Sequence, residues 1–378
     1  MSLLANIFDE RIREPAECVV RVDGRDIGPE GLYPLLREIS VDTSRGEAWT
    51  ASLTFDSRRD EEGRWDVQDK GLFEPWARVE IDARFGDRVE PVFHGFVRES
   101  QGEYPEERGN ATFSVTCQDL SMALDREHRR HSWANEQQPA TDSMVIRQIL
   151  TEHGLILHPD SGSGTGNMTK LNQDETDIRF LRKRAEANGY ELTFYVDSET
   201  AADQVYFGPM RLEATRQPTL RVQAGSATDV LQIRIGEDAQ QPDRIDVTLA
   251  DRQGDSTRTI SVEPAIPVLG RTRLTSGNRG LRPYVVQQSG TAGDDEARIQ
   301  AQAQMKIDTA DIHRVVAEGE LDGSLYGHVL QVGLPVGLDG VGDRHSGIYY
   351  VDRVTHVFDA GGYRQQFTLL RNAVGDNL

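Results

Sequence analysis

The side chains with the greatest potential for chemistry in this sequence are nine histidines and two cysteines. The histidines are His94, His128, His131, His153, His158, His313, His328, His345 and His356. His128 and His131 are spaced i, i+3, and His153 and His158 flank a predicted helix end. Neither pair has a Cys, Asp or Glu partner at a recognised ligand spacing, and no H-E-x-x-H motif occurs. The sequence therefore predicts no metal site.

No spacing typical of a catalytic nucleophile or a phosphate-binding loop occurs either. Cys18 and Cys117 each fall in a strand-like run without a C-x-x-C motif, so we expect buried apolar thiols rather than a disulfide. The glycine-rich run Ser161–Gly166 lacks the Lys-Ser/Thr end of a phosphate-cradling loop. No G-x-S-x-G elbow is present, and the carboxylates are too numerous to single out a glycosidase pair. We predict a protein that has no enzymatic activity and no cofactor.

The formal net charge of −20 limits the partners that this chain can bind. An acidic chain repels nucleic acid and anionic membranes unless its basic residues cluster. The longest basic run, Arg126–His131, is predicted to be a single turn at a domain junction. No apolar stretch reaches the roughly 20 residues of a membrane-spanning helix, and the N-terminus lacks the pattern of a secretory signal. We expect a protein that is made in the cytoplasm and binds neither nucleic acid nor membrane directly.

Hydrophobic periodicity divides the chain into two β-rich regions around a smaller α/β segment. Residues 16–135 alternate apolar and polar side chains in short strands separated by turns such as Asp23-Gly24. Residues 136–217 contain two predicted helices followed by two strands, and residues 218–378 return to strands with one long helix. The predicted fold class is therefore mainly β with an α/β insert.

Several boundaries follow from the same patterns. Residues 1–15 are predicted to form an arm that orders only on contact with a partner. A helix capped by Thr141 or Asp142 is expected to bury Met144, Val145, Ile149 and Leu150. The long helix, from about Asp294 to Ile307, carries a thin apolar stripe of Ala297, Ala301 and Met305. The last strands are expected at His328–Leu334, Gly347–Thr355 and Arg364–Leu370.

The clearest local pattern is a helix that runs into a strand between Thr176 and Tyr195. Thr176 or Asp177 is placed to cap the first amides of the helix, and Asn188-Gly189 to end it in the left-handed conformation. The predicted apolar face consists of Ile178, Phe180, Leu181 and Ala185. The strand that follows alternates apolar Leu192, Phe194 and Val196 with Thr193 and Tyr195.

Two motifs in this sequence resemble those of the hub proteins of contractile tails. The first is D-x-x-F-L-x-x-x-A-E-x-x-G-Y, from Asp177 to Tyr190. The second begins with Gly347-Ile348-Tyr349-Tyr350-Val351 and continues through His356, Phe358 and Gly362-Tyr363 to Leu370-Arg371-Asn372. A looser match covers Phe73–Val97. The chain is thus similar to the phage late-control D family and to the N-terminal half of the valine-glycine-repeat spike proteins of type VI secretion.

This resemblance implies a structural role. It implies two tandem tail-tube-like antiparallel β-barrels, and a homotrimeric ring of pseudo-sixfold outline that joins a hexameric tube to a trimeric spike. The implied partners are the tail tube protein, a separate spike or tip protein and other baseplate components, assembled in a phage tail or injection particle. His356 is expected to be structural. The positions that match the family motifs are Thr176, Asp177, Phe180, Leu181, Ala185, Gly189, Gly347, Tyr350, Val351, His356, Tyr363 and Arg371.

The two β regions also resemble each other weakly. Val79-x-Ile81 aligns with Leu330-x-Val332, and Phe113-Ser114-Val115 aligns with Phe367-Thr368-Leu369. A chance alignment of two antiparallel regions explains these matches equally well. If the repeat is real, three chains present six quasi-equivalent positions. An alternative function is a receptor- or glycan-binding β module, and a less favoured alternative is a cell-wall hydrolase.

Overall fold

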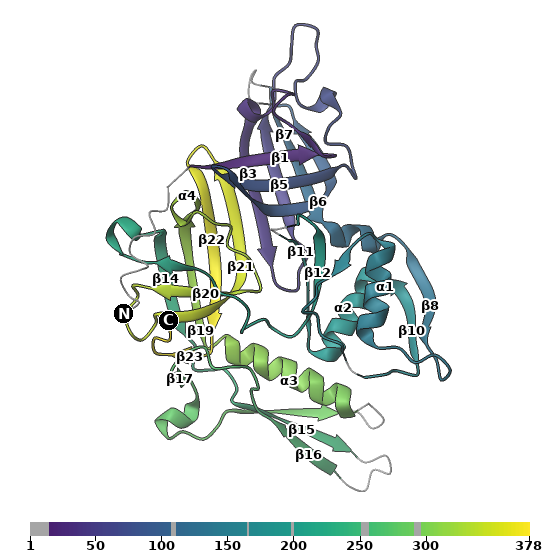
Figure 1. Ribbon diagram of the computed structural model, residues 1–378, viewed down its shortest axis with the longest axis vertical. Helices are drawn as coiled ribbons and strands as arrows, with labels where there is room; N and C mark the ends of the chain where they lie inside the picture. The colour runs from purple at the N-terminus through teal and green to yellow at the C-terminus, as the bar shows by residue number, and fades with distance from the viewer. Residues whose placement is uncertain (1–14, 107–110, 165, 198–199, 251–256, 291–295) are drawn as a thin grey trace.

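The computed structural model describes residues 15–106, 111–164, 166–197, 200–250, 257–290 and 296–378 (Figure 1). The predicted arm, residues 1–15, lies outside the described residues except for Pro15. The fold is mainly β with a helical insert, which confirms the predicted fold class. No helix among the described residues is both long and apolar enough to span a bilayer.

The strands and helices fall into three groups along the chain. The first group consists of β1 Ala16–Val22, β2 Arg25–Asp26, β3 Leu36–Ser44, β4 Thr50–Asp56, β5 Arg78–Phe85, β6 Arg88–Glu103 and β7 Thr112–Asp119. The second consists of β8 His128–Ala134, α1 Asp142–Glu152, β9 Ile156–Leu157, β10 Leu171–Thr176, α2 Asp177–Asn188, β11 Glu191–Val196 and β12 Asp203–Gly208. The third consists of β13 Gln217–Arg221, β14 Val230–Glu237, β15 Arg244–Ala250, β16 Thr257–Val262, β17 Thr272–Arg273, β18 Val285–Gly290, α3 Glu296–Ile312, β19 Val315–Asp322, α4 Gly323–Tyr326, β20 Pro335–Asp339, β21 Gly347–Asp359, β22 Gly362–Arg371 and β23 Ala373–Val374.

One continuous sheet joins the first and third groups. Its strands run in the order β14-β19-β22-β21-β3-β4-β7-β6-β5-β1-β2, from the left of Figure 1 to the upper right. The joint is strand β21, which has a different neighbour at each end. Residues Gly347–Tyr350 pair with β20, whereas Arg353–Asp359 pair antiparallel with β3. The two β regions are therefore fused along their backbones rather than merely tethered.

The same strand order occurs on both sides of this joint. In chain order, the units β3, β4, β6, β7 and β14, β19, β21, β22 are each arranged first-second-fourth-third. Their β-bulges also coincide. The first pair of strands shifts register at Leu36/Glu38 in one unit and at Val230/Gln232 in the other. The last pair shifts at Val97/Glu99 and at Val351/Arg353.

The register corrects the sequence alignment of the two units. Val79 and Ile81 of β5 correspond to Val336 and Leu338 of β20, not to Leu330 and Val332. The predicted strand His328–Leu334 is also wrong, because this segment precedes β20 without strand pairing. It is instead held by side chains: the Gln365 amide accepts from the backbone N–H of Leu330 and donates to the carbonyl of His328.

In the third group, strands β16-β15-β18 form a separate three-stranded sheet that was not anticipated. It lies below the main sheet in Figure 1, beside helix α3. Ile299, Ala303 and Ile307 of α3 are buried on this sheet. The expected stripe residues Ala301 and Met305 instead face Gly189 of the insert, and the side chain of Ala297 is not among those described.

The α/β insert has its own core, built from α1, α2 and the sheet β11-β12-β9. The Thr141 hydroxyl caps α1 by accepting from the N–H of Met144, as predicted. Met144 itself was assigned to the wrong face, because it is exposed while Ile146 is buried. The run Arg126–His131 was also misassigned. From His128 on it is strand β8, paired antiparallel with β10.

Candidate interaction surface

One face of the long sheet carries a row of polar side chains that crosses from strand to strand. Residues directly opposite each other on neighbouring strands share a face, so the register traces rows across the sheet. One row consists of Gln232, Glu320, Gln366, Thr355 and Asp42 on five successive strands. Its members bond to one another: Thr355 donates to Asp42 over 2.6 Å, and Gln232 donates to Glu320 over 3.3 Å.

The opposite face of the same strands is buried. In β3, β4 and β7 the side chains that alternate with the polar ones belong to the first core, for example Val41, Leu53 and Val115. In β19, β21 and β22 the alternating side chains belong to a second core. Each β region thus covers one sheet face with apolar packing and leaves the other to solvent or to a partner.

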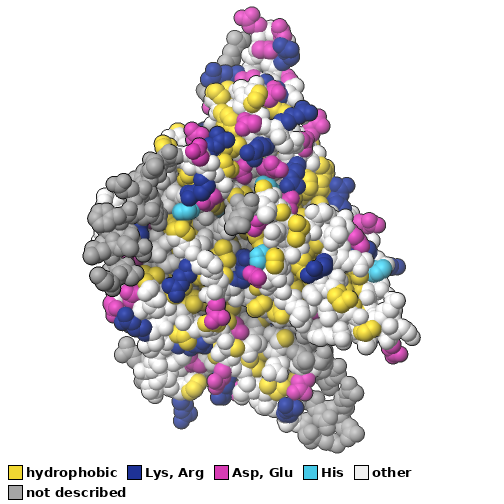
Figure 2. Space-filling view, viewed as in Figure 1, with side chains coloured by type: hydrophobic (Ala, Val, Ile, Leu, Met, Phe, Trp, Pro, Cys, Tyr) yellow, Lys and Arg dark blue, Asp and Glu magenta, His cyan; other side chains and the backbone are white. Residues whose placement is uncertain are grey.

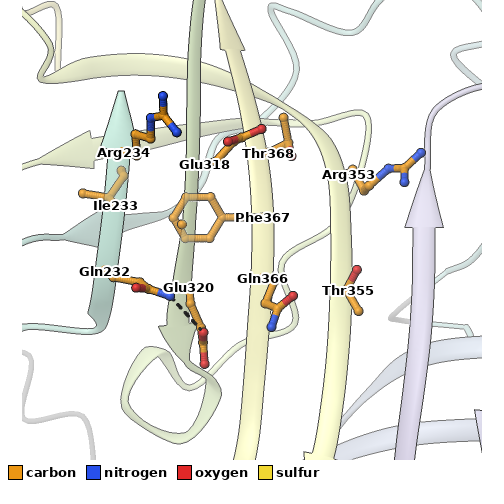
Figure 3. A pocket seen from close by; sticks show the side chains of 11 residues that line it. Gln232, Ile233, Arg234, Glu318, Glu320, Arg353, Thr355, Gln366, Phe367 and Thr368 are labelled. Carbon is orange, nitrogen blue, oxygen red and sulfur yellow. Dashed lines mark hydrogen bonds between the residues drawn. The ribbon is translucent and has the colours of Figure 1, made fainter. Parts of the chain in front are cut away.

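The polar face is hollowed over β14, β19, β22 and β21 (Figure 3). The hollow has a volume of about 510 Å³ and carries charges of both signs: Arg234, Glu318, Glu320 and Arg353. The charged and amide side chains project from four neighbouring strands, and the ring of Phe367 lies against Gly319. No group of three His, Cys, Asp or Glu side chains suited to a metal ion occurs among the described residues. The hollow is therefore lined mainly by polar and charged side chains.

The polar face ends at two strand edges. Within the described residues, β14 pairs with β19 alone. Strand β6 pairs with β5 only as far as Phe96, and two further backbone bonds join Val97 to Trp76 and Ala77. Beyond Val97, β6 continues to Glu103 with β7 as its one neighbour. Unpaired strand edges are templates for pairing with another chain.

Acidic and basic side chains are intermingled on the molecular face shown in Figure 2, without a large patch of one sign. Ion pairs cross between elements, for example Arg344 with Glu237 at 2.6 Å and Arg353 with Glu47 at 2.9 Å. This face gives no support to a nucleic-acid surface, which requires clustered positive charge.

The motif residues of helix α2 are brought together in the core of the insert. Phe180, Leu181 and Ala185 are buried as predicted, and Gly189 ends the helix in the left-handed conformation with φ of 67°. The capping prediction for Thr176 and Asp177 is wrong, because neither side chain bonds the first helical amides. The Thr176 hydroxyl instead donates to Asp125 over 2.6 Å.

Asp177 has a different role in holding the insert together. Its carboxylate accepts from the Gln173 amide at 2.7 Å and lies 2.9 Å from Nε2 of His153. Arg129 of β8 is 3.7 Å away. Asp177 therefore joins α2, the end of α1 and the β8–β10 pair. This contact holds the His153 side chain in place.

Tyr350 lies where the two β regions and the insert meet. Its hydroxyl donates to Glu191 of β11 over 3.0 Å and accepts from the N–H of Arg211. The guanidinium of Arg45 lies over its ring at 5.2 Å and bonds Glu191 at 2.5 Å and Asp352 at 2.7 Å. Burial and the Glu191 carboxylate raise the pKa of Tyr350, so the hydroxyl stays protonated.

Arg45 and Glu191 were missed as functional residues by sequence reasoning. Arg45 follows β3 and Glu191 opens β11, 146 positions away in the chain. Burial alone would lower the pKa of Arg45, but Glu191 and Asp352 outweigh it and raise the pKa. The one available signal in the sequence was the position of Glu191, directly after the Gly189-Tyr190 helix stop. Nothing in the sequence indicated that Glu191 pairs with Arg45.

His356 and Tyr363 form a buried pair between β21 and β22. Nδ1 of His356 lies 2.8 Å from the Tyr363 hydroxyl, and the two rings are stacked. Burial lowers the pKa of His356 to about 3 and raises the pKa of Tyr363 well above its usual value. Both groups are neutral at physiological pH, which fits the structural role expected for His356.

Arg371 is fully buried and holds the C-terminal segment through hydrogen bonds. Its guanidinium donates to the carbonyls of Leu269, His345, Ser346 and Gly375 and to the side chain of Asn377. Gly347, another motif position, has φ of 140°, and a side chain there would collide with this guanidinium. Val351 lies in the same core as the apolar face of β22. The motif positions near the C-terminus thus serve packing.

The neighbouring Asn372 organises a second buried polar cluster that the sequence did not reveal. Its amide donates to Asp311 and to the Pro267 carbonyl, each at 2.9 Å. Asp311 also binds Arg314 at 2.9 Å and Arg273 at 3.1 Å. Buried charges of this kind are stable only when paired, and here they join α3 to the C-terminal strand.

The two cysteines are both free thiols, Cys117 buried and Cys18 partly so. Burial raises the pKa of Cys117 to about 12 and that of Cys18 still further, so neither is a reactive thiolate. His128 bonds Asp174 at 2.8 Å, and His131 packs edge-on against Trp133. The two cysteines, His128 and His131 are thus engaged in packing and in cross-strand hydrogen bonds.

Solved structures that are similar to this chain include two tail proteins and a type VI secretion component. The tail protein from Neisseria meningitidis MC58 matches with a TM-score of 0.65 and 13% identity, covering 95% of this chain and 97% of that one. The 43 kDa tail protein of prophage MuSo2 from Shewanella oneidensis matches with a TM-score of 0.63 and 17% identity, covering 95% and 99%. A component of the type VI secretion system from E. coli matches with a TM-score of 0.57 and 11% identity, covering 93% and 76%.

The chain therefore shares its fold with these two tail proteins over nearly the whole of their length. Residues 16–359 match the Alg8 N-terminal domain family, and the chain belongs to that family. No sequence among curated proteins shows significant similarity to it. The resemblance to the late-control D hub family remains a prediction from the motifs.

Proposed function

We propose that this chain is the structural hub of a contractile tail or injection system, three copies of which form a ring between a hexameric tube and a trimeric spike. The observation that carries the proposal is the repeated four-strand unit within one sheet. Because each chain supplies two units of the same strand order, a threefold ring presents six similar positions. Such a ring matches sixfold symmetry on one side and threefold symmetry on the other.

In this proposal each β region is one tube-like unit and the insert braces them. The domains proposed are residues 16–135, 136–217 and 218–378, with the difference that strand β8 at the end of the first range pairs with β10 and so lies with the insert. The bracing is supported by the contacts of Tyr350 and Arg45, since Glu191 of the insert bonds both of them. A rigid angle between the two units is needed if three chains are to close into a ring.

The partners proposed are a tube protein, a separate spike or tip protein and other baseplate components, in a phage tail or injection particle. The names of the similar structures support this setting, because they are tail proteins and a type VI secretion component. The resemblance of the motifs to hub proteins supports the position at the tube–spike junction. The proposed role is mechanical and involves no catalysis.

The test is to co-express the chain with a candidate tube protein and a candidate tip protein, and to measure the mass and the projected shape of the complex. We expect three chains per particle and a sixfold-like outline in negative-stain averages. A chain that remains monomeric with both proteins present contradicts the proposal. So does specific glycan binding without affinity for tube protein, or clear lysis of peptidoglycan in a zymogram.

A further inference from the structure

Strand β8 of the insert has an edge that no other strand covers within the described part of the chain. It pairs antiparallel with β10, from His128–Thr176 to Ala134–Leu171, and the two strands form a sheet of their own. This pair lies at the outer margin of the insert, at the right of Figure 1. Two paired strands alone are only marginally stable in water. An unpaired edge offers its N–H and C=O groups to a further strand.

The charge of β8 is opposite to that of the chain. Its sequence, His-Arg-Arg-His-Ser-Trp-Ala, contains two arginines, two histidines and no carboxylate. The chain as a whole has a formal net charge of −20. Charged side chains on an edge strand prevent pairing with many other chains. A basic edge repels basic partners but attracts acidic ones, so the edge of β8 is selective for charge.

One face of β8 is held in a fixed arrangement. The guanidinium of Arg129 lies over the Trp133 ring at 4.9 Å and bonds Glu152 of α1 at 2.7 Å. His131 packs edge-on against the same ring, with 4.4 Å between the ring centroids. Alternate residues of a strand share a face, so these three side chains form one row. Side chains that are already ordered lose little conformational entropy when a partner binds.

The opposite face of β8 carries more positive charge than its neighbour strand compensates. The side chain of Arg130 is 83% exposed and bonds Asp174 of β10 at 2.7 Å. His128 lies 2.8 Å from the same carboxylate oxygen. One carboxylate thus serves two basic side chains. A carboxylate on a third strand would lie on the free side of Arg130, and cross-strand pairs of opposite charge stabilise sheets.

A further basic side chain lies just before β8. The guanidinium of Arg126 stacks on the Trp76 ring at 4.0 Å, and no ion pair involves Arg126 among the described residues. Trp76 is 40% exposed and has φ of 76°, a value that bulky residues rarely adopt. Arg126 and Arg129 both line a hollow of about 390 Å³. Since Trp and Arg are enriched at binding hot spots, this end of β8 offers an anchor for a bound segment.

We infer that β8 binds an extended acidic segment of a partner protein, which adds to its free edge as a third strand. In this mode of recognition backbone hydrogen bonds supply affinity and alternate side chains supply specificity. Acidic residues at every second position would lie beside His128 and Arg130, and apolar residues between them would lie beside Trp133. The inference goes beyond the proposed function, because it concerns the insert alone and requires neither the ring nor the repeated unit.

The test measures the fluorescence anisotropy of a labelled peptide of alternating glutamate and valine, mixed with the purified full chain. We expect saturable binding, and slower hydrogen exchange at residues 128–134 when the peptide is bound. Arg130→Glu should weaken binding about tenfold or more, because it brings like charges together. The matched control is Arg258→Glu. Arg258 lies on edge strand β16, is 71% exposed and bonds Glu296 at 3.2 Å, and its replacement should leave binding unchanged.

Backbone pairing is tested separately from charge with two further versions of the peptide. One is methylated on the glutamate nitrogens and the other on the valine nitrogens, so both keep the charge of the parent peptide. Only alternate N–H groups of a strand face a given neighbour, and one of the two versions should therefore lose binding. Equal binding of both versions overturns the addition of a third strand. Equal binding of a lysine–valine peptide overturns the selectivity for acidic segments.

Two other outcomes overturn the inference as a whole. One is the absence of binding by the unmodified glutamate–valine peptide at concentrations up to about 1 mM. The other is binding of a labelled single-stranded oligonucleotide, but not of the peptide, that Arg130→Glu abolishes, since Arg and Trp side chains also stack on bases. None of these results bears on the hub function, which the mass of the assembled particle tests independently.

Discussion

Replacement of Arg371 by methionine should destabilise the protein far more than a single surface charge would. The guanidinium is buried and donates to four backbone carbonyls from three separate segments of the chain. Methionine fills similar space but donates no hydrogen bond, so these carbonyls lose their donor. At about 1 kcal/mol net for each hydrogen bond, the expected loss in the free energy of unfolding is roughly 4 kcal/mol.

The matched control is Arg353→Met. Arg353 is 52% exposed and bonds Glu47 on the surface at 2.9 Å, and exposed ion pairs contribute less than about 1 kcal/mol. Both variants are compared with the unmodified chain by urea denaturation, followed by circular dichroism. Hydrogen exchange should also rise around Arg271 and Leu274, whose amides bond Val374 and Asn372 beside the Arg371 site.

Two results would refute this reasoning. If Arg371→Met lies within 1 kcal/mol of Arg353→Met, the buried hydrogen bonds contribute little, or water replaces the guanidinium. If Arg371→Lys retains full stability, charge alone is sufficient and the geometry of the planar guanidinium is unimportant. The expected result for lysine is an intermediate loss, because one ammonium cannot reach carbonyls on several sides.

Three further predictions concern the packing and the junction. Burial lowers the pKa of His356 to about 3. The contribution of His356 to the free energy of unfolding is therefore complete above the unfolded pKa of about 6.5 and is lost as the pH falls toward 3. At pH 5 the free energy of unfolding should be about 2 kcal/mol lower than at pH 8, and His356→Gln should remove that part of the pH dependence. Gly95→Ala should cost about 1–3 kcal/mol in thermal unfolding because the new methyl meets the Gln118 carbonyl, whereas Gly166→Ala, with open space around it, should be neutral, and equal melting points would contradict this. In a double-mutant cycle, Arg45→Met and Glu191→Gln should show a coupling of about 0.5–3 kcal/mol, because the two side chains bond at 2.5 Å between the insert and β3; additive effects would show that the junction is held by other contacts.

The internal repeat shows which part of the fold the sequence predicted and which part it did not. The sequence suggested that the two β regions are alike, but it aligned Leu330 and Val332 with Val79 and Ile81. The strand register identifies Val336 and Leu338 instead. An alternating pattern repeats every two residues, so shifting it by an even number of residues leaves it unchanged. Only the bulges, which interrupt the alternation at equivalent places, fix the correspondence.

The sequence alone determined those features that depend on neighbouring residues. The apolar face of α2, its left-handed stop at Gly189 and the Thr141 cap each follow from side chains within one helical turn of each other. The mainly β class followed from alternation, and the absence of a recognised catalytic spacing was apparent from the histidines and cysteines. These properties are local, so they can be read without knowing which strands are neighbours.

Tertiary structure alone decided which distant segments meet. The pairing of β21 with β3, the contact of Arg45 with Glu191 and the carbonyls around Arg371 all join residues far apart in the chain. The backbone N–H and C=O groups that pair strands are nearly the same in every residue. The sequence of an edge strand therefore does not identify the strand with which it pairs. The fused sheet and the strand order repeated within it were visible only once the chain was folded.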